Sequence, residues 1–175
     1  MKFSPVNVEG AFIIELSPFS DDRGFFARAY CENEFMEHGI GVHMVQANMS
    51  YNKQRGILRG LHWQASPYEE AKFVRCIKGS LFDVVVDVRP ESPTYKQWSG
   101  IELTSVNRKA LFIPGGCAHG YQVLEDDTEV LYQVSAPYVQ EAEQGARWND
   151  PAFGIEWPIK EGLILSSKDK DWDDF

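Results

Sequence analysis

The sequence predicts an all-β domain, built as a β-sandwich or a barrel. Turn residues recur about every 8 to 12 residues, the spacing of short antiparallel strands. The segments between the turns alternate apolar and polar side chains or are rich in Val, Ile, Phe and Tyr. A short helix is expected only at residues 33–38, and no repeat or low-complexity linker divides the chain. We therefore expect a single domain over residues 1–175.

Each strand is placed where an apolar or alternating segment ends at a turn signal. Lys-Gly, Arg-Pro, Pro-Gly-Gly and Glu-Asp-Asp motifs separate the later segments, and such motifs are typical of turns. In chain order, the expected strands are residues 11–16, 42–47, 56–64, 71–77, 81–88, 97–103, 110–113, 120–124 and 129–135.

The strand at residues 81–88 has two different faces. Phe82 and Val84 point to one side, whereas Asp83 and Asp87 point to the other, because side chains alternate along a strand. We expect the first face to pack in the core and the second to carry polar groups.

Two other segments stand out. Within residues 129–135, Tyr132 is a lone phenol on a face of valines, and a buried phenol needs a hydrogen-bond partner or a ligand. Residues 166–175 are rich in aspartate. We expect them to form a loosely held surface segment, parts of which can fold back over a pocket.

Composition and charge narrow the classes of function. With 43% hydrophobic residues the chain has the composition of a globular protein and not of a disordered one. The chain has 17 Lys and Arg against 26 Asp and Glu, a net charge of −9 that repels nucleic acid. An anionic small molecule stays compatible with this charge, because the local charge of a pocket decides binding there.

The expected location is the cytoplasm. No apolar run approaches the ~18 residues needed to span a bilayer, so no membrane contact is expected. Residues 1–10 lack the charged start and apolar stretch of a signal peptide. The three cysteines, Cys31, Cys76 and Cys117, are an odd number without a CxxC pair, which favours reduced thiols.

Arg59 and His62 form the first candidate for chemistry. A neutral imidazole accepts a proton near neutral pH, and an arginine fork suits phosphate oxygens. On an ideal strand the two side chains point to opposite faces. Both therefore enter one pocket only if Gly60 marks a β-bulge or if the ligand curves around the strand. A structural histidine beside a solvent-facing arginine is the alternative, and both interpretations stay open.

Further polar and aromatic residues allow similar pairs of interpretations. His119 lies among glycines and can point into a barrel mouth or be structural. Lys72 can face inward and stabilise an oxyanion, or lie on the surface as most lysines do. Tyr132, Tyr138 and Trp63 can be core aromatics, or can supply a stacking ring and a proton-donating phenol.

Known motifs for other chemistries are missing from the sequence. Metal sites of cupin type need paired histidines, a following Glu and a distant third His, whereas this chain has four His in other positions. A serine nucleophile elbow, a phosphate-binding P-loop and a dinucleotide-binding glycine motif are also absent. We therefore expect no metal and an acid/base site.

Seven short segments, in order and in register over almost the whole chain, resemble the dTDP-4-dehydrorhamnose 3,5-epimerase family. They are Asp22-Arg23-Gly24-Phe25-Phe26, Val45-Gln46-Ala47-Asn48, Leu58-Arg59-Gly60-Leu61-His62, Ala71-Lys72-Phe73-Val74-Arg75, Phe82-Asp83-Val84-Val85-Val86-Asp87, Ile113-Pro114 through Ala118-His119-Gly120, and Trp148-Asn149-Asp150-Pro151. The resemblance implies a cupin-type double-stranded β-helix, or jelly roll, without metal or other cofactor and usually a homodimer. It also implies the substrate dTDP-4-dehydro-6-deoxy-D-glucose, on the way to dTDP-L-rhamnose.

The resemblance also implies catalytic roles. His62 matches the family's base and Asp169 the carboxylate that orients it, while Tyr132 matches the acid on the opposite face. Lys72 matches the residue that stabilises the enolate, and His119 matches another substrate-binding position. In a 4-keto sugar the protons on C3 and C5 are both α to the carbonyl, so a base, an oxyanion stabiliser and an acid suffice for epimerisation.

Nucleotide-binding positions follow from the same resemblance. Tyr138 matches the residue that stacks on thymine. The other matching positions are Arg23, Gln46, Asn48, Arg59, Glu143 and Lys168. Three of these side chains are cations, which is how an acidic protein can hold a diphosphate.

The sequence departs from the family pattern in several places. Arg28 and Ala47 occupy nucleotide-binding positions where Glu and Asp are common, Met49 replaces a frequent His, and Gln133 replaces a Lys after the tyrosine. Asp83 is a second candidate for the carboxylate that orients the base.

Three functions therefore stay open. The first is the 3,5-epimerase. The second is an epimerase of one carbon only, or a ketoisomerase, on a related nucleotide 4-keto-6-deoxy sugar. The third is a silent cupin that binds a nucleotide sugar. A binding module has no need for both His62 and Tyr132 across one pocket, whereas an epimerase needs both.

Overall fold

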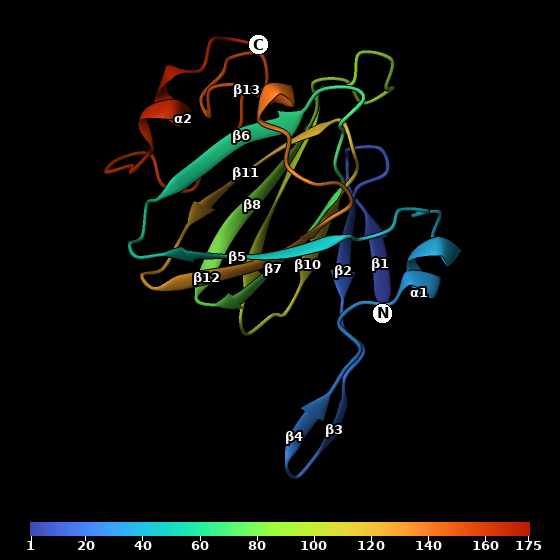
Figure 1. The fold of residues 1–175 in the computed structure, drawn as a ribbon. Coiled ribbons are helices and arrows are strands. Elements are labelled where there is room, and N and C mark those ends of the chain that lie inside the picture. The colour runs from blue at the N-terminus through green and yellow to red at the C-terminus, as the bar shows by residue number, and fades with distance from the viewer.

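Two antiparallel β-sheets packed face to face form the body of the molecule (Figure 1). The computed structural model describes all residues, 1–175. In spatial order, the six-stranded sheet contains β1 (Lys2–Pro5), β2 (Phe12–Glu15), β10 (Ala110–Ile113), β7 (Lys72–Lys78), β12 (Thr128–Val134) and β5 (Gln46–Asn52). The five-stranded sheet contains β13 (Glu143–Gly145), β6 (Leu58–Gln64), β11 (Cys117–Val123), β8 (Ser80–Asp87) and β9 (Trp98–Thr104). From β5 onward the chain repeatedly crosses between the sheets, as a jelly roll requires, so the predicted fold class is confirmed.

Small elements surround the two sheets. β3 (Phe19–Asp21) and β4 (Gly24–Phe26) form a separate hairpin that extends away from the sheets (Figure 1). The helices are α1 (Glu32–Glu37), α2 (Ser167–Asp171) and the 3-10 turn η1 (Gln140–Ala142). No helix of the chain has the length and hydropathy needed to cross a bilayer.

Most predicted strands are confirmed within a few residues of their ends. The strand predicted at 42–47 is wrong, because the observed strand begins four residues later. β5 begins only at Gln46 and pairs with β12 from Gln46 to Asn52. The prediction followed the apolar residues, whereas the residues of β5 that point inward are polar. The four strands β1, β3, β4 and β13, each three or four residues long, were not predicted.

Three apolar clusters explain how the sheets hold together. One lies between the sheets, a second packs the outer face of the five-stranded sheet against residues 146–165, and a third lies under α1 around Phe35. Both faces of β8 are therefore buried. This corrects the expected contrast between a core face and a polar face: Asp83 and Asp87 are fully buried, like the valines that alternate with them.

The expectation for the tail is correct in part: most of residues 166–175 are exposed, and Lys168 and Asp169 fold back to line a pocket, but the segment is not loosely held. Residues 167–171 form α2, and Asp169 on this helix is buried. The backbone N–H of Phe175 donates to Asp150 Oδ2 at 2.7 Å, and its ring lies 5.0 Å from that of Phe153. The segment is thus fixed across one end of the five-stranded sheet (Figure 1).

Candidate active site

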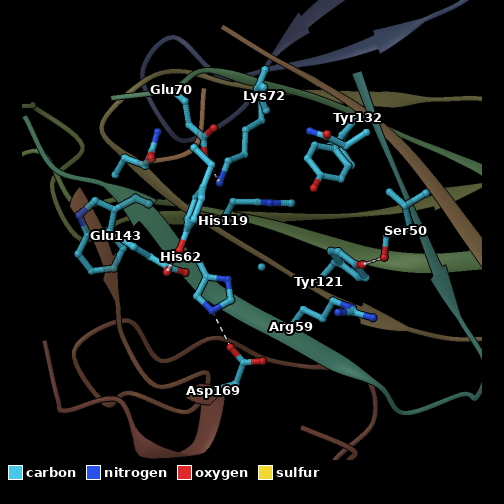
Figure 2. Close-up of a pocket in the computed structure, with 18 of the residues that line it drawn as sticks. Ser50, Arg59, His62, Glu70, Lys72, His119, Tyr121, Tyr132, Glu143 and Asp169 are labelled. Atoms are coloured by element: carbon cyan, nitrogen blue, oxygen red, sulfur yellow. Dashed lines mark hydrogen bonds and ion pairs between the residues drawn. The ribbon is translucent and has the colours of Figure 1, made fainter. Parts of the chain in front are cut away.

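A cavity of about 510 Å³ opens between the two sheets, within the ~300–1,000 Å³ typical of small-molecule sites. Figure 2 shows side chains of both sheets and of the C-terminal segment pointing into it. The residues predicted for the site that line it are Gln46, Asn48, Arg59, His62, Lys72, His119, Tyr132, Tyr138, Glu143, Lys168 and Asp169.

A β-bulge brings Arg59 and His62 into the same cavity. His62 pairs with His119 and Arg59 with Tyr121, so two residues of β6 oppose one residue of β11. Gly60 makes this possible: its φ is 115°, and a Cβ there would lie 2.6 Å from the Cα of Gly120. Because of the extra residue, Arg59 and His62 point to the same face of β6, whereas on an ideal strand they would point to opposite faces.

His62 and Asp169 form a hydrogen-bonded pair at the cavity wall. His62 Nε2 lies 2.6 Å from Asp169 Oδ1, and the aspartate side chain is only 6% exposed. Burial by itself raises the pKa of Asp169, but hydrogen bonds from His62 and Ser166 outweigh it and the pKa is lowered. An ionised carboxylate therefore accepts the Nε2 proton, which leaves Nδ1 as the free acceptor of the neutral ring.

Tyr132 faces this pair from the other sheet. It lies on β12 between Val130 and Val134, and Figure 2 shows its ring and that of His62 pointing into the cavity from different sheets. Burial, with the nearby Tyr121 and Glu70, raises the pKa of the Tyr132 phenol. The phenol is therefore neutral at physiological pH and can donate a proton.

Lys72 lies inside the cavity and forms an ion pair there. Its Nζ is 3.0 Å from Glu70 Oε1, and each side chain is only 11% exposed. The interpretation of Lys72 as a surface residue is thus wrong. Glu70 was not predicted, because it lies before the strand, where alternation assigns no face.

His119 has a carboxylate partner of its own. Its Nε2 lies 2.7 Å from Oδ1 of Asp83, which is fully buried. Asp83 therefore holds His119, whereas Asp169 holds His62. The second oxygen of Asp83 has no hydrogen-bond partner.

Polar side chains of β5 form hydrogen bonds along the cavity. Arg59 Nε donates to Asn52 Oδ1 at 3.0 Å, and Gln46 Nε2 donates to Asn48 Oδ1 at 2.7 Å. Ser50 and Tyr121, neither of them predicted, share a hydrogen bond of 2.9 Å. Ser50 follows Gln46 and Asn48 at steps of two residues, so strand alternation was the signal that would have found it.

Glu143 organises the cavity rim. Its carboxylate accepts a hydrogen bond from Tyr138 Oη at 2.5 Å and pairs with Lys168. Burial by itself raises the pKa of Glu143, but Lys168 and Tyr138 outweigh it and the pKa is lowered. The exposed ring of Tyr138 is thereby held beside the cavity.

Three predicted binding residues lie outside this cavity. Arg23 is exposed at the tip of the β3–β4 hairpin, 2.6 Å from Asp21. Arg28 pairs with Glu34 at 2.6 Å, and Ala47 is exposed on the other face of β5 from Gln46. Within one chain these residues are not brought together with the others. No three His, Cys, Asp or Glu side chains are grouped so that they could hold a metal ion.

Comparison with known proteins agrees with this geometry. The family model for dTDP-4-dehydrorhamnose 3,5-epimerase matches residues 5–175. The dTDP-4-dehydrorhamnose 3,5-epimerase of Sinorhizobium fredii is 43% identical over 169 residues, covering 97% of this chain and 87% of the relative. The Bacillus anthracis enzyme, solved with TDP and PPi bound, superposes with a TM-score of 0.95 at 37% identity over 99% of each chain. ChmJ, a 3'-monoepimerase from Streptomyces bikiniensis solved with dTDP-quinovose, gives a TM-score of 0.88 at 31% identity over 97% of this chain and 86% of its own. The chain therefore belongs to the dTDP-4-dehydrorhamnose 3,5-epimerase family, and it is an enzyme.

Proposed function

We propose that this enzyme inverts C3 and C5 of dTDP-4-dehydro-6-deoxy-D-glucose to give dTDP-4-dehydro-L-rhamnose. One observation carries the proposal: His62 and Tyr132 enter one cavity from opposite sheets (Figure 2). Inversion removes a proton from one face of a carbon and returns one to the other face. A base and an acid on two sides of the substrate meet this requirement.

The steps follow from the side chains. His62 Nδ1 takes the proton from the carbon next to the C4 carbonyl, and the C–H electron pair becomes an enolate with its charge on O4. The Lys72 ammonium stabilises that charge. Tyr132 then gives its phenolic proton to the opposite face of the carbon, and the ketone reforms. Asp169 stabilises the imidazolium formed in the first step.

The proposal also assigns the residues that hold the nucleotide half of the substrate. In the proposal Arg59 and Lys168 bind the diphosphate, Gln46 and Asn48 donate hydrogen bonds, and Tyr138 stacks on the base. Arg59 hydrogen-bonds the neutral Asn52 and has no carboxylate partner, so its charge is available to a phosphate although the protein's net charge is −9.

A homodimer is part of the proposal. Arg23 lies on a hairpin that extends away from its own cavity, so it can bind nucleotide only in the cavity of a second copy (Figure 1). Arg28 and Ala47, exposed outside the same cavity, are assigned to that shared region. We also place the enzyme in the cytoplasm, whose reducing conditions suit three free thiols.

An epimerase of one carbon is the second candidate, because the 3'-monoepimerase ChmJ shares the fold at 31% identity. The deciding experiment is incubation with dTDP-4-dehydro-6-deoxy-D-glucose in heavy water, followed by NMR. Deuterium at both C3 and C5 supports the 3,5-epimerase, and deuterium at one carbon supports the second candidate. No exchange at either carbon would overturn both.

The His62→Ala variant is the control for that experiment. We expect it to bind dTDP with the affinity of the wild type while exchange falls by ~10²- to 10⁴-fold. Wild-type exchange in this variant would show that another residue is the base.

A further inference from the structure

The contact between His62 and Asp169 depends on a very short helix. α2 spans only Ser167–Asp171, and a helix of this length has no stability of its own in water. Ser166 caps its first turn by accepting a hydrogen bond from the Asp169 N–H at 3.1 Å. A cap alone does not hold α2 against β6, so another contact must keep Asp169 in place.

Trp172, the residue after α2, makes such a contact with the backbone of Gly145 in β13. A Cβ on Gly145 would lie between 2.1 and 2.5 Å from three atoms of the indole, so the ring fills the space that any other residue would need. Gly145 is directly opposite His62 in the pairing of β13 with β6. The indole is therefore seated on the strand pair that carries the base.

The indole also lies between two residues of the site. Its centroid is 6.2 Å from that of the His62 ring, in an edge-to-face arrangement, and Lys168 Nζ lies 5.6 Å from it. Trp172 does not line the cavity, and its ring nitrogen is buried without a hydrogen-bond partner. Its contacts are therefore packing contacts.

We propose that Trp172 is a positioning residue, whose indole, wedged on Gly145, seats α2 so that Asp169 meets His62. The expected effects on kcat rest on the proposed function, whereas the contact between Trp172 and Gly145 does not depend on it. On the far side of Trp172, Phe175 is anchored to Asp150 and packs 5.9 Å from Trp63. The chain that follows α2 is thus held at two points, Trp172 and Phe175.

Kinetics of single and double variants test this role. Because Trp172 acts through Asp169, we expect Trp172→Ala to lower kcat by about 10²-fold, with a smaller change in the affinity for dTDP. Its pH profile should match that of Asp169→Asn. In the Asp169→Asn background the same change should cost nothing further. An additive loss, or full kcat in Trp172→Ala, would overturn the inference.

Two variants keep the test valid if Trp172→Ala does not fold. Gly145→Ala pushes the indole away while leaving it in the chain, and we expect the same loss of kcat. Trp172→Phe retains a flat ring on Gly145 and should recover most of the activity. The matched control is Trp98→Ala, which removes an equally large ring from β9, away from α2. A loss of kcat in this control as large as in Trp172→Ala would also contradict the proposal.

A spectroscopic readout separates this inference from the proposed function. The ring proton between His62 Nε2 and Asp169 is observable by NMR and is assigned by its disappearance in His62→Ala. We expect Trp172→Ala to abolish that signal, whereas Trp98→Ala retains it. A retained signal in Trp172→Ala overturns the positioning role, and failure of the wild type to exchange deuterium overturns only the proposed function.

Discussion

The phenol of Tyr132 is kept protonated by its surroundings. Burial contributes most to its raised pKa, and Tyr121 and the Glu70 carboxylate raise it further, whereas the Arg59 guanidinium opposes them. The acid form is therefore present up to a pH above the ordinary value of about 10. This suits a residue that must give a proton to an enolate and then recover it from solvent.

Tyr132→Phe tests the acid role. Because His62 and Asp169 are untouched, we expect the variant still to exchange substrate protons with solvent. Inverted product should fall by ~10²-fold or more, since no donor faces the other side of the carbon. Heavy-water NMR measures both quantities in one sample. Normal product formation would place the acid elsewhere.

Glu70→Gln tests the ion pair with Lys72. A charge-assisted hydrogen bond is worth about 1.5–3 kcal/mol, so we expect kcat to fall ~10- to 100-fold. The Glu70 charge also raises the pKa of Tyr132, so its removal should move the alkaline limb of the pH profile to lower pH. The neighbouring Glu69→Gln, at an exposed position, is the control. If both variants behave alike, Glu70 has no special role.

The residues of the site differ in how far the sequence could predict them. His62, Lys72 and Tyr132 were assigned from the family resemblance, and the structure places all three in one cavity. The sequence does not decide whether Arg59 and His62 point to the same face, because this depends on a β-bulge that only the pairing of β6 with β11 reveals. Glu70 lies before β7 and before the predicted strand at 71–77, so alternation could not assign it to the cavity.

At the scale of elements, the end of β8 is held by one buried carboxylate. Asp87 accepts hydrogen bonds from Arg89 Nη2 at 2.7 Å, Ser92 Oγ at 2.5 Å and Thr94 Oγ1 at 2.6 Å. Burial by itself raises the pKa of Asp87, but these donors outweigh it and the pKa is lowered. The ionised group thus organises the connection from β8 to β9.

Asp87→Ala should lower the free energy of unfolding by about 1.5–3 kcal/mol at neutral pH, because it removes the charge-assisted hydrogen bonds that Asp87 accepts from Arg89. The stabilisation is complete above the unfolded pKa of about 4 and is lost as pH falls through the lower folded value. The difference between wild type and variant in urea unfolding should therefore shrink below pH ~4. The exposed Asp173→Ala should show little change at any pH. A constant difference across this range would rule out the carboxylate as the cause.

Elements buried in the sheets were predicted well, and those defined by tertiary contacts were not. The apolar segment at 110–113 matches β10 at both ends. By contrast β5 was misplaced, because its inward face of Gln46, Asn48 and Ser50 is polar. α2 was missed because its aspartate-rich sequence resembles a solvated tail, while its position depends on contacts with β6 and β13.

At the scale of the whole molecule, the β3–β4 hairpin is the feature that a single chain leaves unexplained. Phe19 and Phe26 are 78% and 76% exposed on it, and exposed large apolar side chains that lie together mark interaction surfaces. The hairpin buries no residue of its own strands. Its position, together with the predicted role of Arg23, is the reason for proposing a homodimer in which each chain completes the other's cavity.

Mixing two inactive variants tests this arrangement. In a dimer of one Arg23→Ala chain and one His62→Ala chain, the trans arrangement gives one cavity with both defects and one with neither. A one-to-one mixture refolded together should therefore recover about a quarter of wild-type activity at low substrate concentration, since half of the dimers are mixed. The control is a mixture of His62→Ala with Tyr132→Phe, which should recover nothing because both residues line the cavity of one chain. If the first mixture also recovers nothing while each chain is folded and dimeric, Arg23 does not act across the interface, and the hairpin must be assigned another role.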